Sequence, residues 1–410
     1  MVRIETEMKN YIGIEEISEC LGSIIKKDEI AKVVSFLTQF SAYLLDDQLN
    51  LIIASLSSTG KTYVLLNVAH LFPSEDVIVL GYSSPKAFFH ELGIFDREKR
   101  KIYINLERKN LIFLDQPHPE LLAKLRPILS HDQKEIEVKI TDKNQRGGNL
   151  TKSVIIRGFP AVSFATTYLK LDEQEITRAL IISPEVTQEK VEEGIDLIAE
   201  SKTNEEFEKV IRDDAGLNLL KERLLKFKEI SPRLKGIKFD IEKDELKKAY
   251  MENKNLAPKD MRNFKKFLVL AECFAGLNFE NDRVQNNILI VKKEDIEEAK
   301  KLWQEIGKYQ DVGVMPFALD VYYKVILPLY KEGNVLTKKV IMKGLQSRFY
   351  TSIQLWYLEQ QVLPALETSG YISIEKNPQD KRQIIVIPLI DADGQDKNNE
   401  NEEISNLLYN

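Results

Sequence analysis

The feature that most constrains this 410-residue chain is a short run of small and polar residues between two apolar segments. The first segment, Leu49–Ser55, is typical of a buried β-strand, and the second begins a helix at Gly60-Lys61-Thr62. Successive backbone N–H groups in such a loop and at a helix N-terminus bind phosphate oxygens. The sequence therefore predicts a phosphate-binding loop. The residues expected to hold a nucleotide are Ser57, Ser58, Thr59, Gly60, Lys61, Thr62 and Tyr63.

Two side chains of this loop have specific expected roles. Lys61 would reach the β- and γ-phosphates of ATP, and the Thr62 hydroxyl would bind Mg²⁺. Ser55 replaces the first glycine that is usual in such loops, and we treat it as tolerated because residues 57–59 are small. The alternative is an ordinary helix start, which the preceding strand and a second motif both disfavour.

The second motif is an apolar run, residues 111–114, that ends in Asp115 and Gln116. An aspartate at the carboxyl end of a strand is typical of Mg²⁺ coordination in α/β sheets. A glutamate that polarises the attacking water usually follows, but an amide cannot accept a proton at neutral pH. Three alternatives follow: slow hydrolysis, substitution by another acid such as Glu120 or Asp132, or a binding switch.

Apolar β-rich runs alternate with helical ones over residues 49–185, which predicts an α/β fold with a mostly parallel sheet between helices. The expected strands are Leu49–Ser55, Asp76–Leu80, Asn110–Asp115, Ala161–Thr166 and Ala179–Ser183. Around this core we expect an N-terminal helical segment (1–48), a charged helical region (186–310), a third unit (311–390) and a disordered acidic tail (391–410).

Polar residues also follow or precede the later strands. Thr166 and Thr167 end one expected strand, and Arg178 directly precedes the last. With the two earlier motifs, this order resembles that of AAA+ P-loop NTPases. The resemblance implies that Thr166 or Thr167 is a polar sensor and that Arg178 is an arginine finger for a neighbouring subunit's γ-phosphate. The alternatives are satisfied strand-end hydroxyls and an ordinary surface cation.

A β-hairpin is expected over residues 135–157, where alternating or apolar arms flank the turn residues 146–149. Residues 137–157 contain five basic and two acidic side chains. The hairpin resembles the pre-sensor hairpin of MCM-type and viral ring helicases, which grips DNA phosphates in the pore. The alternative is an exposed, solvated hairpin. The DNA-binding candidates are Lys139, Lys143, Arg146 and Lys152.

The region 186–310 is expected to be a helical lid. Arg262 begins a helix with an apolar face, and Val291–Trp303 contains an acidic helix start. This arrangement resembles the MCM lid, and by that resemblance Arg262 is the second sensor, also directed at the γ-phosphate. The alternative is a surface residue at a helix N-terminus. The resemblance covers roughly residues 50–183 and 257–305, and residues 187–256 have no counterpart in it.

The unit 311–390 resembles a winged helix, with three helices followed by two strands. The expected elements are Pro316–Lys331, Thr337–Arg348, Thr351–Glu367, Tyr371–Lys376 and Gln383–Pro388. Winged helices often bind duplex DNA, and many mediate only protein contacts, so both alternatives stay open. The DNA-binding candidates are Lys338, Lys339, Lys343, Lys381 and Arg382.

Composition limits the remaining possibilities. The chain is 43% hydrophobic and 30% charged, no apolar run approaches the length of a membrane span, and no signal peptide is recognisable. Two cysteines without metal-ligand spacing favour a reducing cytoplasm. The net charge is −6, and residues 391–410, with six acids and one lysine, hold −5 of it. The rest of the chain is therefore compatible with a DNA partner.

These features together predict an ATP- and Mg²⁺-dependent AAA+ ATPase that translocates on single-stranded or duplex DNA as a homo-oligomer, with a hexameric ring expected and no membrane partner. A zinc-containing MCM collar is absent, so a plasmid-, virus- or transposon-type replication helicase fits better. One alternative is an ATP-switched DNA-binding initiator or loader, which Gln116 favours. Another is an NTP-regulated signalling or transcription-control protein with little translocation.

Overall fold

The computed structural model describes residues 11–45, 47–81, 88–89, 92–99, 101–142, 150–167, 173–251, 256–310, 314–349, 353–377 and 382–389. At its centre lies a five-stranded parallel sheet with the order β2-β5-β8-β1-β9. The strands are β1 (Asn50–Ala54), β2 (Val77–Leu80), β5 (Asn110–Phe113), β8 (Ala161–Thr166) and β9 (Leu180–Ile182). The five strands expected from the sequence are present, and the mixed α/β class with a parallel sheet is confirmed.

The strand order decides what lies next to the phosphate loop. Strand β8 is inserted between β1 and β5, with Ala54 opposite Thr166 and Phe113 opposite Phe164. All five strands run in the same direction, so their carboxyl ends share one edge of the sheet. The residues that follow β1, β8 and β5 therefore come together, although they are far apart in the sequence.

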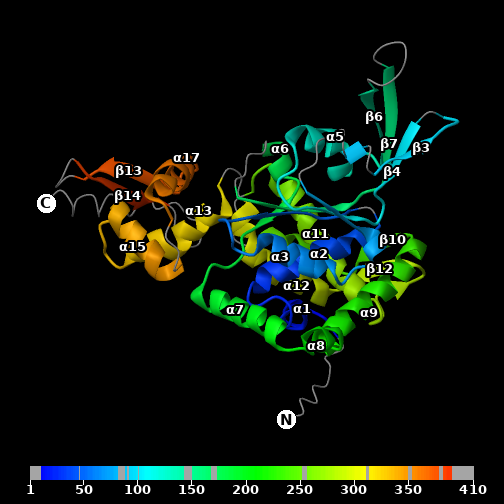
Figure 1. The fold of residues 1–410 in the computed structure, drawn as a ribbon, viewed down its shortest axis with the longest axis horizontal. Helices are drawn as coiled ribbons and strands as arrows, with labels where there is room; N and C mark the ends of the chain where they lie inside the picture. The colour runs from blue at the N-terminus through cyan, green and yellow to red at the C-terminus, as the bar shows by residue number, and fades with distance from the viewer. Residues whose placement is uncertain are drawn as a thin grey trace, which may run out of the picture.

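Both faces of the sheet are buried, as expected for a parallel sheet. Leu51 and Ile53 contribute to one apolar core, and Ile52 and Ala54 contribute to the core on the other side. The first core includes side chains of α1 (Ile14–Leu21), α2 (Glu29–Phe40), α3 (Lys61–Ala69), α9 (Ala215–Ile230), α11 (Asp260–Leu277) and α12 (Lys293–Ile306). The second contains α5 (Pro119–Leu129) and the hairpin strands. Figure 1 shows these layers around the sheet.

The expected hairpin consists of β6 (Glu135–Asp142) and β7 (Leu150–Arg157), paired antiparallel along their whole length. It projects from the body of the molecule (Figure 1). Two strands that the sequence did not predict extend it: β4 (Lys101–Asn105) is parallel to β7, and β3 (Ile94–Asp96) pairs with β4. These strands are short, and the partner of β4 follows about 50 residues later, so local periodicity could not reveal the pairing.

The region 186–310 is not entirely helical, so that expectation was wrong in part. A small sheet with the order β10-β12-β11 lies among its helices. Its strands are β10 (Gly236–Phe239), β11 (Val284–Gln285) and β12 (Ile288–Val291), each too short to give a periodic signal. The remaining helices of this region are α7 (Gln188–Thr203), α8 (Phe207–Arg212) and α10 (Lys243–Met251).

The last described part of the chain has its own apolar core. Its elements are α13 (Pro316–Val321), the π-helical η5 (Tyr322–Ile326), α14 (Leu327–Lys331), α15 (Lys338–Phe349), α16 (Leu355–Tyr357), the π-helical η6 (Leu358–Val362), α17 (Leu363–Thr368), β13 (Ile372–Lys376) and β14 (Ile384–Pro388). This is the expected order of three helices and two strands, and the winged-helix assignment itself stays a prediction. The Gln310 side chain joins this unit to the central sheet by hydrogen bonds with the backbone of Ile181 at 2.8 and 3.1 Å.

Short elements complete the described fold. They are η1 (Ser41–Tyr43), η2 (Ser74–Asp76), α6 (Glu173–Ile176), η3 (Ser231–Arg233) and η4 (Gly307–Gln310). Within the described ranges, no helix is both long and apolar enough to cross a membrane.

Candidate nucleotide site

The predicted phosphate loop connects the carboxyl end of β1 to the first residue of α3. Ser58 and Gly60 have φ angles of 63° and 84°, in the left-handed region that glycine adopts without strain. Left-handed residues within such a loop turn successive N–H groups toward one concave side. Thr59 closes the loop, because its hydroxyl donates to the Leu56 carbonyl at 3.0 Å. The backbone geometry therefore fits an anionic group, and Ser57 and Ser58 are exposed there.

Lys61, the first residue of α3, turns its side chain back over the loop. Its Nζ donates to the backbone carbonyl oxygens of Ser55, at 2.9 Å, and of Leu56. Burial lowers the pKa of Lys61 to about 8, and the nearby Asp115 carboxylate opposes that shift. The lysine is thus positioned by neutral carbonyl groups rather than by a tight ion pair, which leaves its charge available to an anion in the loop.

Asp115, Gln116 and Thr166 meet beside the loop, as the strand order requires. The Gln116 backbone N–H donates to the Asp115 carboxylate at 2.7 Å, and the Thr166 hydroxyl donates to the Gln116 side-chain oxygen at 3.3 Å. Asp115 is exposed, whereas Thr166 is buried and the following Thr167 is half-buried. Thr62 is half-buried in the first turn of α3. The edge thus combines a carboxylate, an amide and hydroxyl groups.

Glu120 and Asp132, the two acids considered as substitutes for the missing glutamate, lie at opposite edges of the sheet. Glu120 begins α5 on the edge of the loop, where it pairs with Lys124 at 2.6 Å. Asp132 follows the other end of α5 and lines a hollow with Leu49 and Arg178, at the amino ends of the strands. Asp132 therefore lies on the opposite side of the sheet from the phosphate loop of its own subunit, and a role for either acid in hydrolysis stays a prediction.

Lys190, at the start of α7, contacts the loop and was not found from the sequence. Its Nζ donates to the backbone carbonyl oxygens of Thr59 at 2.9 Å and of Glu185 at 3.1 Å, and it also pairs with Asp28. The Asp28 carboxylate is buried and accepts the Glu185 N–H at 2.7 Å. Lys190 stands 131 or more residues from these loop and N-terminal partners, in a region without a recognisable motif, so no local signal marks it.

Tyr63, which the sequence predicts to contact the nucleotide, is an exposed residue of α3. The ring is 47% exposed, and the hydroxyl donates to the Ile24 carbonyl at 2.7 Å. Burial raises the pKa of the Tyr63 phenol. The residue thus connects α3 to the segment after α1, and its role toward a base or ribose stays a prediction.

The two arginines lie together, at the edge of the sheet opposite the phosphate loop. Arg178 precedes β9 and is largely buried, with hydrogen bonds to the Ser130 hydroxyl and the Gln174 carbonyl. Arg262 is exposed, and its guanidinium donates to the Thr177 hydroxyl at 2.6 Å. Both line a hollow of about 360 Å³. Neither side chain faces the Lys61 of its own subunit.

The described hairpin lysines point to opposite faces of the sheet. Lys139 is exposed and lies across from Ser153, whereas Lys152 lies across from the buried Ile140 and has its Nζ 5.5 Å from the centre of the Phe95 ring. Directly opposed residues of an antiparallel pair share a face, so the two lysines cannot contact one phosphate. Lys143 and Arg146, at the tip, lie outside the described residues.

The basic residues of the C-terminal unit differ in their availability. Lys338 pairs with Glu359 at 2.6 Å, whereas Lys339 and Lys343 are exposed on α15. Arg382 is exposed before β14, and Lys381 lies outside the described residues. The helix face of Lys339 and Lys343 is thus the more accessible cationic surface of this unit.

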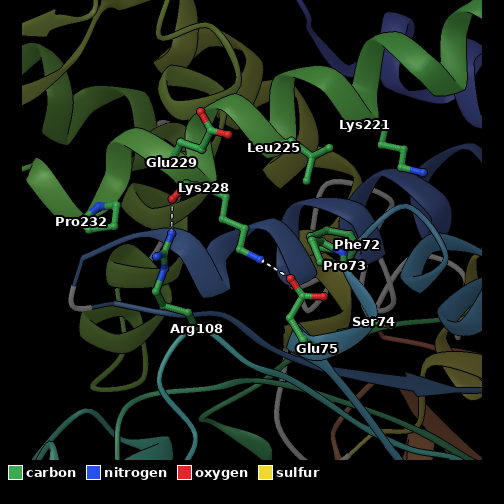
Figure 2. Close-up of a pocket in the computed structure, with 10 residues that line it drawn as sticks. All are labelled: Phe72, Pro73, Ser74, Glu75, Arg108, Lys221, Leu225, Lys228, Glu229 and Pro232. Carbon is green, nitrogen blue, oxygen red and sulfur yellow. Dashed lines mark hydrogen bonds and ion pairs between the residues drawn. The ribbon is translucent and has the colours of Figure 1, made fainter.

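A larger hollow, of about 670 Å³, lies between η2, Arg108 and α9 (Figure 2). One of its cations, Lys228, is paired, since it contacts Glu75 at 3.0 Å and Asp76 at 2.6 Å. The Arg108 guanidinium donates to the Lys228 carbonyl and, at 2.9 Å, to the Ser231 hydroxyl. These contacts join α9 to the central sheet, so we assign the hollow a structural role.

No known protein family matches this chain, and no curated protein matches it either. Among solved structures, it is similar to SCCmec type IV Cch, which is described as an active helicase. The two sequences are 10% identical, the match covers 97% of this chain and 71% of that chain, and the TM-score is 0.39. It is also similar to a full-length MCM homolog from Methanopyrus kandleri: 14% identity, 71% and 58% covered, TM-score 0.37.

Proposed function

We propose that this chain is an AAA+ ATPase that uses ATP to move along DNA as a ring-forming, replication-type helicase motor. The observation that carries the proposal is the distribution of charge over two edges of one parallel sheet. Lys61 and Asp115 lie at the carboxyl edge with the phosphate loop, and Arg178 and Arg262 lie at the amino edge. Such a division suits a nucleotide held between neighbouring copies.

The residues at the carboxyl edge suit ATP and Mg²⁺. The left-handed loop would bind the phosphates with its N–H groups, and Lys61 would neutralise the β- and γ-phosphates. Asp115 and the Thr62 hydroxyl would hold Mg²⁺ together with phosphate oxygens, because carboxylate, hydroxyl and phosphate oxygens are the ligands that Mg²⁺ prefers. Bound Mg²⁺ supplies charge neutralisation. Thr166 and Gln116 would orient the attacking water.

The arginines would complete the site of the neighbouring subunit. Arg262 is the better placed of the two to reach out, because it is exposed, whereas Arg178 is 11% exposed and held by Glu175 and its neighbours. An arginine supplied in trans stabilises the charge that develops on the transferred phosphoryl group. In this arrangement Arg178 either acts as the arginine finger itself or holds Arg262 in place. The nucleotide site would then be complete only in the assembled oligomer, for which a hexamer is expected.

The projecting hairpin would contact the DNA. Its strands are anchored in the second core through Ile136 and Ile156, so movement of the core would carry the tip with it. Lys139, Lys143 and Arg146 would contact phosphates, which requires charge and reach but no base reading. The exposed Lys339 and Lys343 of the proposed winged helix would add a duplex contact.

A second candidate function is an ATP-switched initiator or loader that hydrolyses ATP slowly. One observation favours it: the group that Thr166 holds beside the loop is the amide of Gln116, which cannot take a proton from water. In that case ATP would control assembly on DNA, and the hairpin would hold the strand without moving along it.

The two functions differ in ATP turnover on DNA. For the motor we expect ATP hydrolysis that single-stranded or duplex DNA stimulates, and nucleotide-dependent strand displacement. Lys61→Ala should reduce turnover by about 100-fold or more, because a phosphate-binding cation is lost. A Lys143→Ala/Arg146→Ala variant should hydrolyse ATP without DNA stimulation or displacement. Lys235→Ala, at an exposed position directly before β10, is the matched control.

The outcomes separate the candidates. ATP binding that Lys61→Ala abolishes, without DNA-stimulated hydrolysis or strand displacement by the wild-type chain, would establish the switch instead of the motor. Wild-type protein that binds no ATP would contradict both.

A further inference from the structure

Helix α7 presents an apolar stripe to solvent. Val191, Ile195 and Ile198 are 55%, 59% and 64% exposed. Their spacing of four and three residues places them on one face of the helix. A 16-residue helix is marginally stable alone in water, and clustered exposed aliphatic side chains typically mark a contact site. The stripe is therefore a candidate contact site for a partner surface.

The charges around the stripe restrict what could cover it. Helix α7 contains five acidic and two basic residues, a net charge of −3. Glu192 and Asp196 are exposed next to the apolar side chains. A partner surface should thus combine exposed apolar groups with positive charge, and another part of this chain does so.

That surface is the start of α11. Residues 259–266 hold four basic residues and one acid, of which Lys266 and Asp260 are buried, so Lys259, Arg262 and Lys265 supply the positive charge at the surface. Met261 is 73% exposed and is followed by the exposed cations Arg262 and Lys265, and Leu256 nearby is 53% exposed. Met261, Arg262 and Lys265 line the same hollow. The two surfaces are complementary in charge, and each carries large apolar side chains.

The positions of the two surfaces exclude their contact within one molecule. Helix α7 begins at the phosphate loop, where Lys190 contacts the Thr59 carbonyl. Arg262 lies at the opposite edge of the sheet, beside Thr177. A neighbour that brings its Arg262 to this loop would necessarily lie next to α7.

We propose that α7 docks on the start of α11 of a second copy of this chain. Val191, Ile195 and Ile198 would pack around Met261, and the acids of α7 would face Lys265, while Arg262 would reach toward the phosphate loop. The inference rests on the proposed function, because the arginines in trans determine which edges meet. Since the two surfaces differ, the contact is head-to-tail and generates a ring or a filament.

Two variants and a mixture test this interface. Ile195→Asp/Ile198→Asp disables the α7 surface, and Met261→Asp disables the α11 surface. Val335→Asp, at a residue that is 53% exposed between α14 and α15, is the matched control. Mass would be measured by sedimentation velocity in a slowly hydrolysed ATP analogue. Binding of a fluorescent ATP analogue and circular dichroism would verify the fold, which substitutions at exposed positions should preserve.

We expect the wild-type chain and Val335→Asp to assemble. Each interface variant alone should associate about 100-fold more weakly, because apolar contacts are replaced by a buried charge. Mixed together, the two variants should form a one-to-one heterodimer and nothing larger, since such a pair retains one intact α7 surface and one intact α11 surface.

Three results would overturn the interface. They are assembly of the variants at wild-type strength, no heterodimer in the mixture, and a wild-type chain that binds the analogue but stays monomeric. In all three the analogue still binds, so the nucleotide site of the proposed function is unaffected. Failure of the wild-type chain to bind the analogue would instead contradict the proposed function, and the interface with it.

Discussion

At the scale of single residues, the proposed hydrolysis of ATP depends most on Gln116. Its side-chain oxygen accepts the Thr166 hydroxyl, so the amide is held in a defined position beside Asp115. A carboxylate at the same position could accept the same hydrogen bond and could also take a proton from water. The difference between glutamine and glutamate is thus a difference in chemistry rather than in geometry.

We therefore expect Gln116→Glu to raise the rate of ATP hydrolysis by about 100-fold, within the range for an added general base. Single-turnover hydrolysis, with the protein in saturating excess over ATP, measures the chemical step. Gln116→Asn is the control, because it keeps an amide and shortens its reach. An unchanged rate in Gln116→Glu would show that another group, such as Glu120, already serves as the base.

At the scale of elements, α11 connects Arg262 to the first core and carries two buried ionisable groups. Lys266 donates to the Ala179 carbonyl at 2.7 Å, and burial beside Arg262 lowers the pKa of this lysine to about 7. Burial, with a contribution from Asp47, raises the pKa of Glu272 to about 8. The carboxyl of Glu272 is thus neutral in the folded protein at neutral pH, and unfolding would ionise it.

The stability of the fold should depend on pH through Glu272. Its pKa is near 4.5 in the unfolded chain and about 8 in the fold, so stability is lost as pH rises between these values. From pH 5.5 to 7.0 the wild-type chain should lose about 2 kcal/mol more than Glu272→Gln. Lys266 contributes little there, because its stabilisation is lost as pH falls from 10.5 toward 7.

Chemical denaturation of both proteins at the two pH values measures this difference. Glu200→Gln, at an exposed position of α7, should behave like the wild-type chain. Equal pH dependence in Glu272→Gln and the wild-type chain would mean that Glu272 is ionised in the fold.

At the scale of the whole molecule, one sheet separates the two halves of a proposed active site. Lys61 lies at the carboxyl edge and Arg262 at the amino edge. Each copy would then supply its carboxyl edge to the site that it shares with one neighbour and its amino edge to the site that it shares with the other. Two different defects, one on each edge, should therefore compensate when placed in different copies.

We expect Lys61→Ala and Arg262→Ala each to be inactive alone, and an equal mixture to recover ATPase activity. With random assembly, about one quarter of the sites would combine an intact Lys61 with an intact Arg262 from the neighbour. A mixture of Lys61→Ala with Asp115→Ala is the control, and it should stay inactive because both changes affect the same edge. No recovery in the first mixture would place Arg262 in the site of its own subunit.

The sequence alone predicts the hairpin and the five strands of the central sheet, which the structure contains, and also a phosphate loop and a metal-binding Asp115, which stay predictions. These features depend on contacts close along the chain, so residue type and periodicity reveal them. Tertiary packing places β8 between β1 and β5 and brings Lys190 to Thr59. It also places Asp132 at the amino edge of the sheet, away from the phosphate loop. Strand order and the burial of a helix face arise from contacts between distant segments. The exposed stripe of α7 is apparent only after the rest of the chain has packed.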